Sequence, residues 1–107
     1  MVLQIQDSGS KLTDGTVQLL HTSTFVGVQV VQVDLSPMQA GDTVVLKVNT
    51  KVLTGSAEAI FIEQTFTGVQ AEPVIQSEPV ASPHSYAATL QQTGGVYRTF
   101  DWSVNSV

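Results

Sequence analysis

Apolar and polar residues alternate along short runs of this chain, and turn-forming residues separate the runs. Such a period of two is typical of β-strands that bury one face. Valine is the commonest residue, with 17 copies, and its branched side chain favours the pleated backbone. The pattern predicts about eight strands. They cover residues 2–6, 16–21, 25–35, 43–53, 58–67, 74–76, 85–93 and 96–104.

Three of these runs place three apolar side chains at alternate positions. Every second residue is apolar, which on a pleated strand places those side chains on the same side of a sheet. We therefore expect them to face a common core. They are Val44, Leu46 and Val48 in the first run, Tyr86, Ala88 and Leu90 in the second, and Phe100, Trp102 and Val104 in the third.

The long run 25–35 changes phase in its middle. Valines occupy the even positions from Val26 to Val30, and apolar residues occupy the odd positions from Val31 to Leu35. A slip of one residue turns every later side chain to the opposite face, so we expect a β-bulge near these two valines. A strand that is buried on both faces is the alternative.

Turn-forming residues separate the runs. Residues 7–10 predict a turn after the first strand, and the Asp-Gly pair at 14–15 is typical of a hairpin connection. Residues 36–42 predict one short helical turn, because serine and proline stand where such a turn starts and glycine where it ends. We expect this turn to point Leu35 and Met38 inward.

A proline-spaced segment, residues 72–84, interrupts the strand pattern. Proline has no N–H for a strand ladder, so we expect an edge segment that pairs briefly. The regular spacing of strands and turns predicts one domain, residues 1–107, with an all-β, jelly-roll-like fold of two sheets packed as a β-sandwich. An open barrel is the alternative. Residues 1–10 form either a strand or an N-terminal arm.

Composition narrows the function classes. The chain has no cysteine, which excludes disulfides, thiolate metal sites and cysteine nucleophiles and favours production in a cytoplasm. Only 12% of residues are charged, against roughly 25% in an average soluble protein. Such a surface suits packing against other subunits, because interface cores are depleted of charge. A hydroxyl-rich surface on a monomer is the alternative.

The charge balance argues against nucleic-acid and membrane partners. The net charge is −5, and the four basic residues are spread along the chain. Binding to nucleic acid or to anionic lipid needs clustered lysine or arginine. No apolar run approaches the roughly 18 residues of a membrane span, and the opening residues predict no signal peptide.

No combination of residues predicts catalysis or metal binding. His21 and His84 are far apart in sequence and have no further ligand at metal-binding spacing. No Gly-x-Ser-x-Gly motif occurs, and Asp7, Asp14 and Asp42 stand at expected turns, where aspartate bonds to local backbone. We therefore expect no enzyme activity, no catalytic residue, no metal and no cofactor.

Three aromatic residues are candidates for ligand stacking. Tyr86, Tyr97 and Trp102 could form a platform for a sugar ring, as in carbohydrate-binding β-sandwiches. Tyr97 and Trp102 have opposite strand parity, however, so a regular strand would place them on opposite faces. Trp102 also shares its face with apolar neighbours, which favours a place in the core. Arg98 is expected to stack on an aromatic ring or to lie at the rim.

Two stretches carry a family resemblance. Residues 33–55, VDLSPMQAGDTVVLKVNTKVLTG, and residues 89–104, TLQQTGGVYRTFDWSV, resemble small, cysteine-free virion proteins of tailed bacteriophages. The resemblance implies a structural protein made in the host cytoplasm and carried on the phage head, as a capsid decoration or cement protein. It implies as partners the major capsid protein and copies of the chain itself, with a trimer favoured. It brings no catalytic residues.

Two segments are the expected contact surfaces of such a protein. The N-terminal run and the proline-spaced segment could each add a strand to a neighbouring subunit, and many copies on a lattice would strengthen weak contacts. The alternative function is a β-sandwich carbohydrate-binding module of a fibre or tail component. The expected interface residues are Val2, Leu3, Ile5, Pro73, Val74, Ile75, Pro79 and Pro83.

Overall fold

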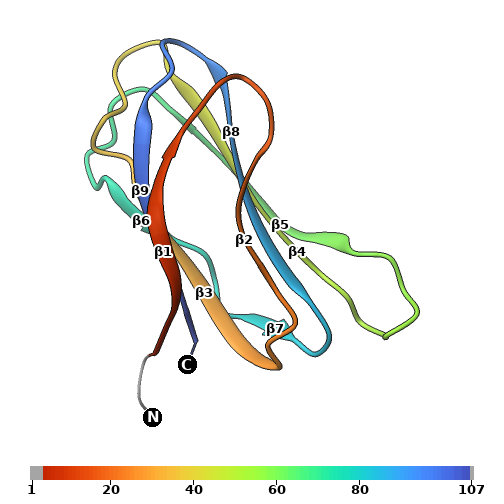
Figure 1. Ribbon diagram of the computed structural model, residues 1–107. Helices are drawn as coiled ribbons and strands as arrows, with labels where there is room; N and C mark the ends of the chain where they lie inside the picture. The colour runs from red at the N-terminus through yellow and green to blue at the C-terminus, as the bar shows by residue number, and fades with distance from the viewer. Residues whose placement is uncertain (1–3, 107) are drawn as a thin grey trace.

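The computed structural model describes residues 4–106 and shows, within them, nine strands in two antiparallel sheets that pack face to face (Figure 1). No helix occurs in this range. The all-β sandwich prediction is therefore confirmed. The first sheet contains β1 (Gln4–Leu12), β9 (Thr99–Ser106), β3 (Gly27–Asp34), β6 (Val74–Gln76) and β7 (Val80–Ser82). The second contains β2 (Gln18–Ser23), β8 (Tyr86–Gly94), β4 (Thr43–Thr50) and β5 (Ala59–Thr67).

The pairing of the strands is that of a jelly roll. β6 and β7 both pair with β3, so they act as one strand interrupted at residues 77–79. Counted in this way, the first strand pairs with the last, β2 with β8, β3 with β6 and β7, and β4 with β5. A jelly roll wraps such a folded-back chain into two sheets of four strands. The Asp-Gly pair at 14–15 therefore connects two sheets, and its prediction as a hairpin turn is wrong.

The core lies between the two sheets and follows the predicted faces. The three apolar triplets of β4, β8 and β9 are all buried, as expected from their alternation. The core contains Leu20, Val31, Val33, Leu35, Met38, Val44, Leu46, Val48, Val80, Tyr86, Ala88, Leu90, Phe100, Trp102 and Val104, with Ile62, Phe66 and Ile75 packed against it.

The N-terminal segment is an edge strand of the first sheet. β1 pairs with β9 from Gln4, opposite Ser106, to Leu12, opposite Thr99, with one irregularity near Ile5. The turn predicted at residues 7–10 is therefore wrong: pairing along β9 overrides the local turn preference of these residues. Of the expected arm, residues 4–10 pair within their own chain, and residues 1–3 lie outside the described residues.

The phase change in residues 25–35 is not a bulge of β3. β3 pairs with β9 without a register shift from Gln29 to Asp34, and Val30 and Val31 are both buried although they face opposite sides. The irregularity lies instead in the segment that pairs with β3, where residues 77–79 between β6 and β7 contain one residue more than a regular ladder needs. Ser77 donates its N–H to Val31 O at 2.9 Å, whereas β7 resumes with Val80 opposite Gln29. The alternative expectation, a strand that is buried on both faces, holds at Val30 and Val31.

Two successive turns replace the short helical turn expected at residues 36–42. Met38 N donates to Leu35 O at 3.0 Å, and Asp42 N donates to Gln39 O at 3.1 Å. Aspartate side chains favour this outcome because they compete for the backbone donors; the Asp42 carboxylate accepts from Gln39 N at 2.9 Å. Leu35 and Met38 are buried as expected.

Candidate functional site

The two ends of the sandwich differ in chemistry. Thr43, at the start of β4, pairs with Gly94, whereas Thr50, at its end, pairs with Tyr86. Loops around Gly94 carry a network of buried polar side chains. The opposite end, around Thr50, carries exposed apolar side chains on a hairpin that projects from the sandwich (Figure 1).

A buried glutamine joins two loops at the polar end, the β1–β2 loop and the β8–β9 loop. The Gln92 amide nitrogen donates to Gly94 O at 3.0 Å and to Val96 O at 2.6 Å. Its carbonyl oxygen accepts from the Thr13 hydroxyl at 2.5 Å. The Thr13 hydroxyl in turn accepts from the Arg98 N–H at 3.1 Å. Both N–H donors and the carbonyl oxygen of the Gln92 amide are engaged, so the side chain fixes the loops that surround it.

Asp42 completes this network. Its buried carboxylate accepts from Val96 N at 3.2 Å, from Gln39 N at 2.9 Å and from Arg98 Nε at 2.5 Å. The hydrogen bond from the Arg98 guanidinium, followed by that from the Gln39 amide, holds the pKa of Asp42 below its usual value. Gly95 has a φ of +85°, and a Cβ there would overlap Asp42. Arg98 thus lies at the rim, paired with a carboxylate.

The substitution Asp42→Asn is expected to lower the melting temperature at pH 7. An amide presents a donor where the carboxylate accepts hydrogen bonds. Because the folded-state pKa of Asp42 is lowered, its contribution to stability is present above the unfolded pKa, about 4. That contribution is lost as the pH falls through the folded-state pKa.

The difference in melting temperature between Asp42→Asn and wild type should therefore shrink as the pH falls from about 5 to about 2. Circular dichroism during heating measures it. Glu63→Gln, at an exposed position of β5, is the control and should behave like wild type. A difference that stays constant over this range would show that the Asp42 charge does not contribute.

A pocket of about 430 Å³ opens beside the polar network. Tyr97 forms one wall, and its side chain is 53% exposed. The Tyr97 hydroxyl lies against Gly15, whose φ is +87° and where a Cβ would clash with that hydroxyl. Gln91 donates from its amide to Gly15 O at 3.1 Å. The pocket is lined by Gly15, Gln91, Gln92, Thr93, Gly94, Gly95 and Tyr97.

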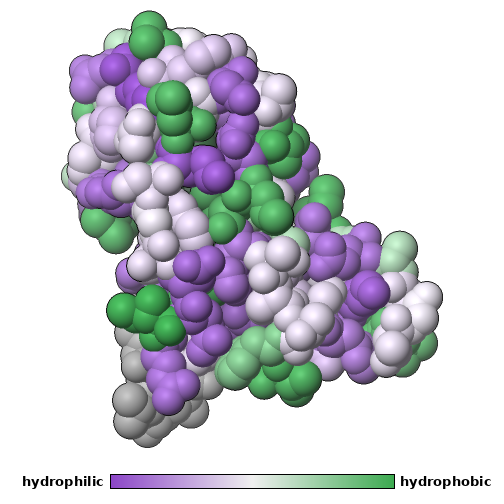
Figure 2. Space-filling model, viewed as in Figure 1, coloured by the Kyte–Doolittle hydropathy of each residue, from purple (hydrophilic) through white to green (hydrophobic). Residues whose placement is uncertain are grey.

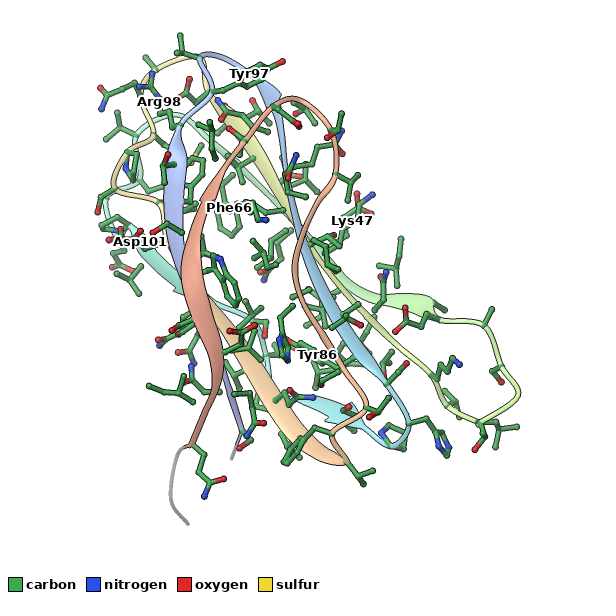
Figure 3. The ribbon with its side chains drawn as sticks, viewed as in Figure 1. Lys47, Phe66, Tyr86, Tyr97, Arg98 and Asp101 are labelled. Atoms are coloured by element: carbon green, nitrogen blue, oxygen red, sulfur yellow. The ribbon has the colours of Figure 1, made fainter. Side chains whose placement is uncertain are left out.

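The structure does not bring the three candidate stacking residues together. Trp102 lies in the core at 9% exposed, and its ring covers Gly9, the residue opposite it on β1. Tyr86 is also buried, which raises the pKa of its hydroxyl. Figure 3 shows Tyr97 at one end of the sandwich and Tyr86 toward the other. Tyr97 is the one member of the three that faces solvent.

An apolar notch of about 420 Å³ marks the opposite end. Phe61, which is 53% exposed, forms part of it. On β5, Ile60 pairs with Asn49 and Ile62 with Val48, so Phe61 is the extra residue of a β-bulge. A bulge changes the direction of the side chain that it carries, and here the bulged residue, Phe61, lines the notch. The notch is lined by Thr50, Lys51, Val52, Phe61, Pro79, Ala81 and Pro83.

Side-chain hydrogen bonds hold the walls of the notch. The Thr50 hydroxyl bonds to Ser85 O at 3.1 Å. Ser85 donates its hydroxyl to the Glu58 carboxylate at 2.8 Å, and Thr54 lies 3.2 Å from His84 Nδ1. These contacts connect the β4–β5 hairpin to the loop that precedes β8. The notch is therefore formed by segments that are fixed relative to each other.

The expected interface residues fall into three groups. Pro79 and Pro83 line the notch, together with Phe61 and Val52, which were not expected there. The other described positions are on sheet edges: Ile5 is exposed on β1, Val74 is exposed on β6, and Pro73 and Ile75 are half-buried beside it. Val2 and Leu3 lie outside the described residues. The sequence signal that could have identified Val52 and Phe61 is the presence of apolar residues on both sides of the turn at 53–56.

The interior also holds buried polar atoms without a protein partner among residues 4–106. Both polar atoms of the Gln29 amide belong to this set although the side chain is fully buried. Burying a polar group without a hydrogen bond costs stability. The same set includes His21 Nε2, Ser23 Oγ, Tyr86 OH and Trp102 Nε1.

The two histidines lie apart, and neither belongs to a cluster of metal-ligating side chains within the described residues. These residues contain no group of three His, Cys, Asp or Glu side chains suited to hold a metal ion. His21 Nδ1 lies 3.1 Å from Asp7 Oδ2, where β1 and β2 face each other, and His84 contacts Thr54. Between residues 4 and 106, no helix is long and apolar enough to cross a membrane.

Comparison with known proteins gives no relative to argue from: no family model, no curated protein and no solved structure matches the chain. The function is therefore inferred from the geometry of the two ends.

Proposed function

We propose that this chain is a non-enzymatic structural protein of a tailed-phage virion, a capsid decoration or cement protein that acts through the hairpin end of the sandwich. The observation that carries the proposal is the apolar notch beside the projecting β4–β5 hairpin. The resemblance of residues 33–55 and 89–104 to small phage virion proteins supports the phage assignment. Jelly rolls occur in viral capsid and lectin domains, so the fold is compatible with the role.

Exposed apolar side chains gather on the hairpin and the start of β5. They are Val52, Leu53, Ile60 and Phe61, each more than half exposed, and Figure 2 shows hydrophobic surface on the projecting hairpin. Among the residues that line the notch, Lys51 is the one with a charge. Interface cores are depleted of charge and rich in aromatic residues, and exposed apolar patches mark sites of interaction.

A second copy of the chain is the first partner we propose for this end. Leu53 stands at the hairpin turn, which Ser56 N closes by donating to Leu53 O at 3.0 Å. The hairpin thus carries an apolar projection and an apolar notch side by side. Insertion of the Leu53 turn of one copy into the notch of the next is a head-to-tail contact, and such contacts form a ring when the rotation between copies closes. A trimer is the ring that we favour.

The sheet edges offer a second kind of contact, toward the capsid protein. β1 ends the first sheet on one side and β6 with β7 on the other, and β5 ends the second sheet. An edge strand adds a neighbouring strand through main-chain hydrogen bonds. Ile5 and Val74 are exposed on these edges, where a capsid segment would meet them.

The substitution Phe61→Asp tests the notch. A charge in an apolar contact is expected to weaken self-association and head binding by about 30-fold, the effect of losing one interface hot spot. The variant should fold normally because Phe61 is half exposed. Sedimentation velocity measures the oligomer, and pull-down with purified phage heads that lack the protein measures attachment.

Val69→Asp is the matched control. Val69 is 67% exposed and does not line the notch, so this variant should associate like wild type. A wild-type protein that is monomeric and does not attach to heads would overturn the proposal. So would a Phe61→Asp variant that associates and attaches as wild type does.

The alternative, a carbohydrate-binding module of a fibre or tail component, loses two of its three candidate residues. Trp102 and Tyr86 are buried, so they are not part of an exposed platform. Tyr97 and its pocket are the observation that still favours sugar binding.

A further inference from the structure

The polar end of the sandwich holds a pocket that the assembly role leaves unused. The pocket and the notch lie at opposite ends of β4, beside Thr43 and Thr50 respectively. A ligand in the pocket would therefore not compete with a subunit in the notch. The inference below does not rest on the proposed assembly function.

The lining of the pocket selects a class of ligand. It consists of glycine backbone, two glutamines, one threonine and one tyrosine, with no charged side chain. The nearby cation, Arg98, is already paired with Asp42. Anionic ligands such as phosphates need basic side chains or clustered backbone donors with a favourable charge. A neutral ligand with many hydroxyl groups matches amide, hydroxyl and aromatic partners instead.

Tyr97 provides the apolar part of the pocket. Its side chain is half exposed, while its hydroxyl is held against Gly15. A tyrosine ring has an apolar face and a polar tip, which suits contact with the C–H face of a sugar ring. Among residues 4–106, Gln91 uses its amide nitrogen to bond to Gly15 O, and its carbonyl oxygen makes no side-chain hydrogen bond of its own. That oxygen and the exposed Thr93 hydroxyl are available to a ligand.

The buried network beneath the pocket fixes its shape. Gln92 and Asp42 together bond to the backbone of Gly94 and Val96, on both sides of the Gly95 turn. Thr13 connects this turn to the loop that contains Gly15. Binding to a site that is already formed avoids the entropy cost of ordering loops.

We propose that this pocket binds a neutral saccharide, with one pyranose ring stacked on Tyr97 and its hydroxyl groups bonded to Gln91 and Thr93. A single ring in a shallow site gives dissociation constants on the order of 1 mM. Longer chains of the same sugar bind more tightly where further rings contact the loops.

The test uses the full chain and methyl glycosides of glucose, galactose, mannose and N-acetylglucosamine. Nitrogen-15 NMR follows the backbone amides of Gly15, Thr93, Gly94 and Gly95, which line the pocket. At least one glycoside should shift these signals with saturation. Tyr97→Ala should weaken that binding about 10-fold or more, whereas Tyr97→Phe, which keeps the ring, should bind within about 3-fold of wild type.

Two variants and one charged ligand serve as controls. Val96→Ala changes a neighbouring side chain that is 67% exposed and outside the lining, so it should bind as wild type does. Thr93→Arg fills the mouth of the pocket without touching the contact between Tyr97 and Gly15, so it should block binding. A glucose phosphate should bind no more tightly than the neutral glycoside.

Three results would overturn the proposal. They are the absence of saturable shifts with every glycoside, shifts confined to amides outside the pocket, and equal affinity in wild type and Tyr97→Ala. Because the notch and head attachment are measured separately, failure of the saccharide site leaves the assembly proposal standing, and the reverse also holds.

Discussion

Replacing Trp102 with alanine is expected to lower the free energy of unfolding by about 3–5 kcal/mol. The Trp102 side chain is buried between the sheets and covers Gly9 on the neighbouring strand. Its removal leaves a cavity that the paired strands β1 and β9 prevent from closing. Urea unfolding followed by circular dichroism measures the change.

Trp102→Phe is the matched variant for this position. The indole N–H has no partner among the described residues, so phenylalanine removes no hydrogen bond and leaves a smaller cavity. It should cost clearly less than the alanine substitution. A Trp102→Ala protein as stable as wild type would mean that the ring does not belong to the core, and would restore Trp102 as a candidate for ligand stacking.

The second large effect on stability is expected at two buried glutamines, Gln92 and Gln29. The two side chains differ in their hydrogen bonds, so their replacement should change the free energy of unfolding differently. Gln92→Met should lower the free energy of unfolding by about 2–4 kcal/mol, since it removes the amide donor from the carbonyls of Gly94 and Val96 and the acceptor that Gln92 offers to the Thr13 hydroxyl. Gln29→Met should leave stability unchanged or raise it by about 1–2 kcal/mol. Neither atom of the Gln29 amide has a protein partner among residues 4–106.

The comparison of the two methionine variants is independent of size and burial. Both glutamines are fully buried, and methionine is close to glutamine in volume, so packing changes little. Urea unfolding of both variants under one set of conditions measures the difference. Equal destabilisation by Gln29→Met and Gln92→Met would show that Gln29 is hydrogen-bonded in solution.

The layered β architecture was accessible from the sequence because it depends on a local signal. In β4, the recurrence of Val44, Leu46 and Val48 at every second position identified the buried face, and the structure buries all three. The turn predicted at residues 7–10 is wrong because their conformation does not depend on a local signal. Their composition favours a turn, but their conformation depends on β9, a strand at the other end of the chain.

The candidate sites depend on contacts that a local pattern does not contain. Thr13 bonds to Gln92, and Arg98 bonds to Asp42, across 79 and 56 positions of sequence. The local pattern places Asp42 at a turn and Arg98 on an aromatic ring or at the rim, and it does not predict the partner of either side chain. Of the residues that line the notch, only Pro79 and Pro83 were among the predicted interface residues. Phe61 joins them because a bulge, set by the pairing of β4 with β5, turns it there.

The pairing of the first strand with the last has a consequence for biosynthesis. Gln4 lies opposite Ser106, so β1 leaves the ribosome long before its partner has been made. Ladders between such distant segments form slowly, on the millisecond to second scale of β-sandwiches in general. Until β9 is made, β1 and β3 lack the strand that lies between them in the first sheet, so this sheet is completed only when β9 enters between them.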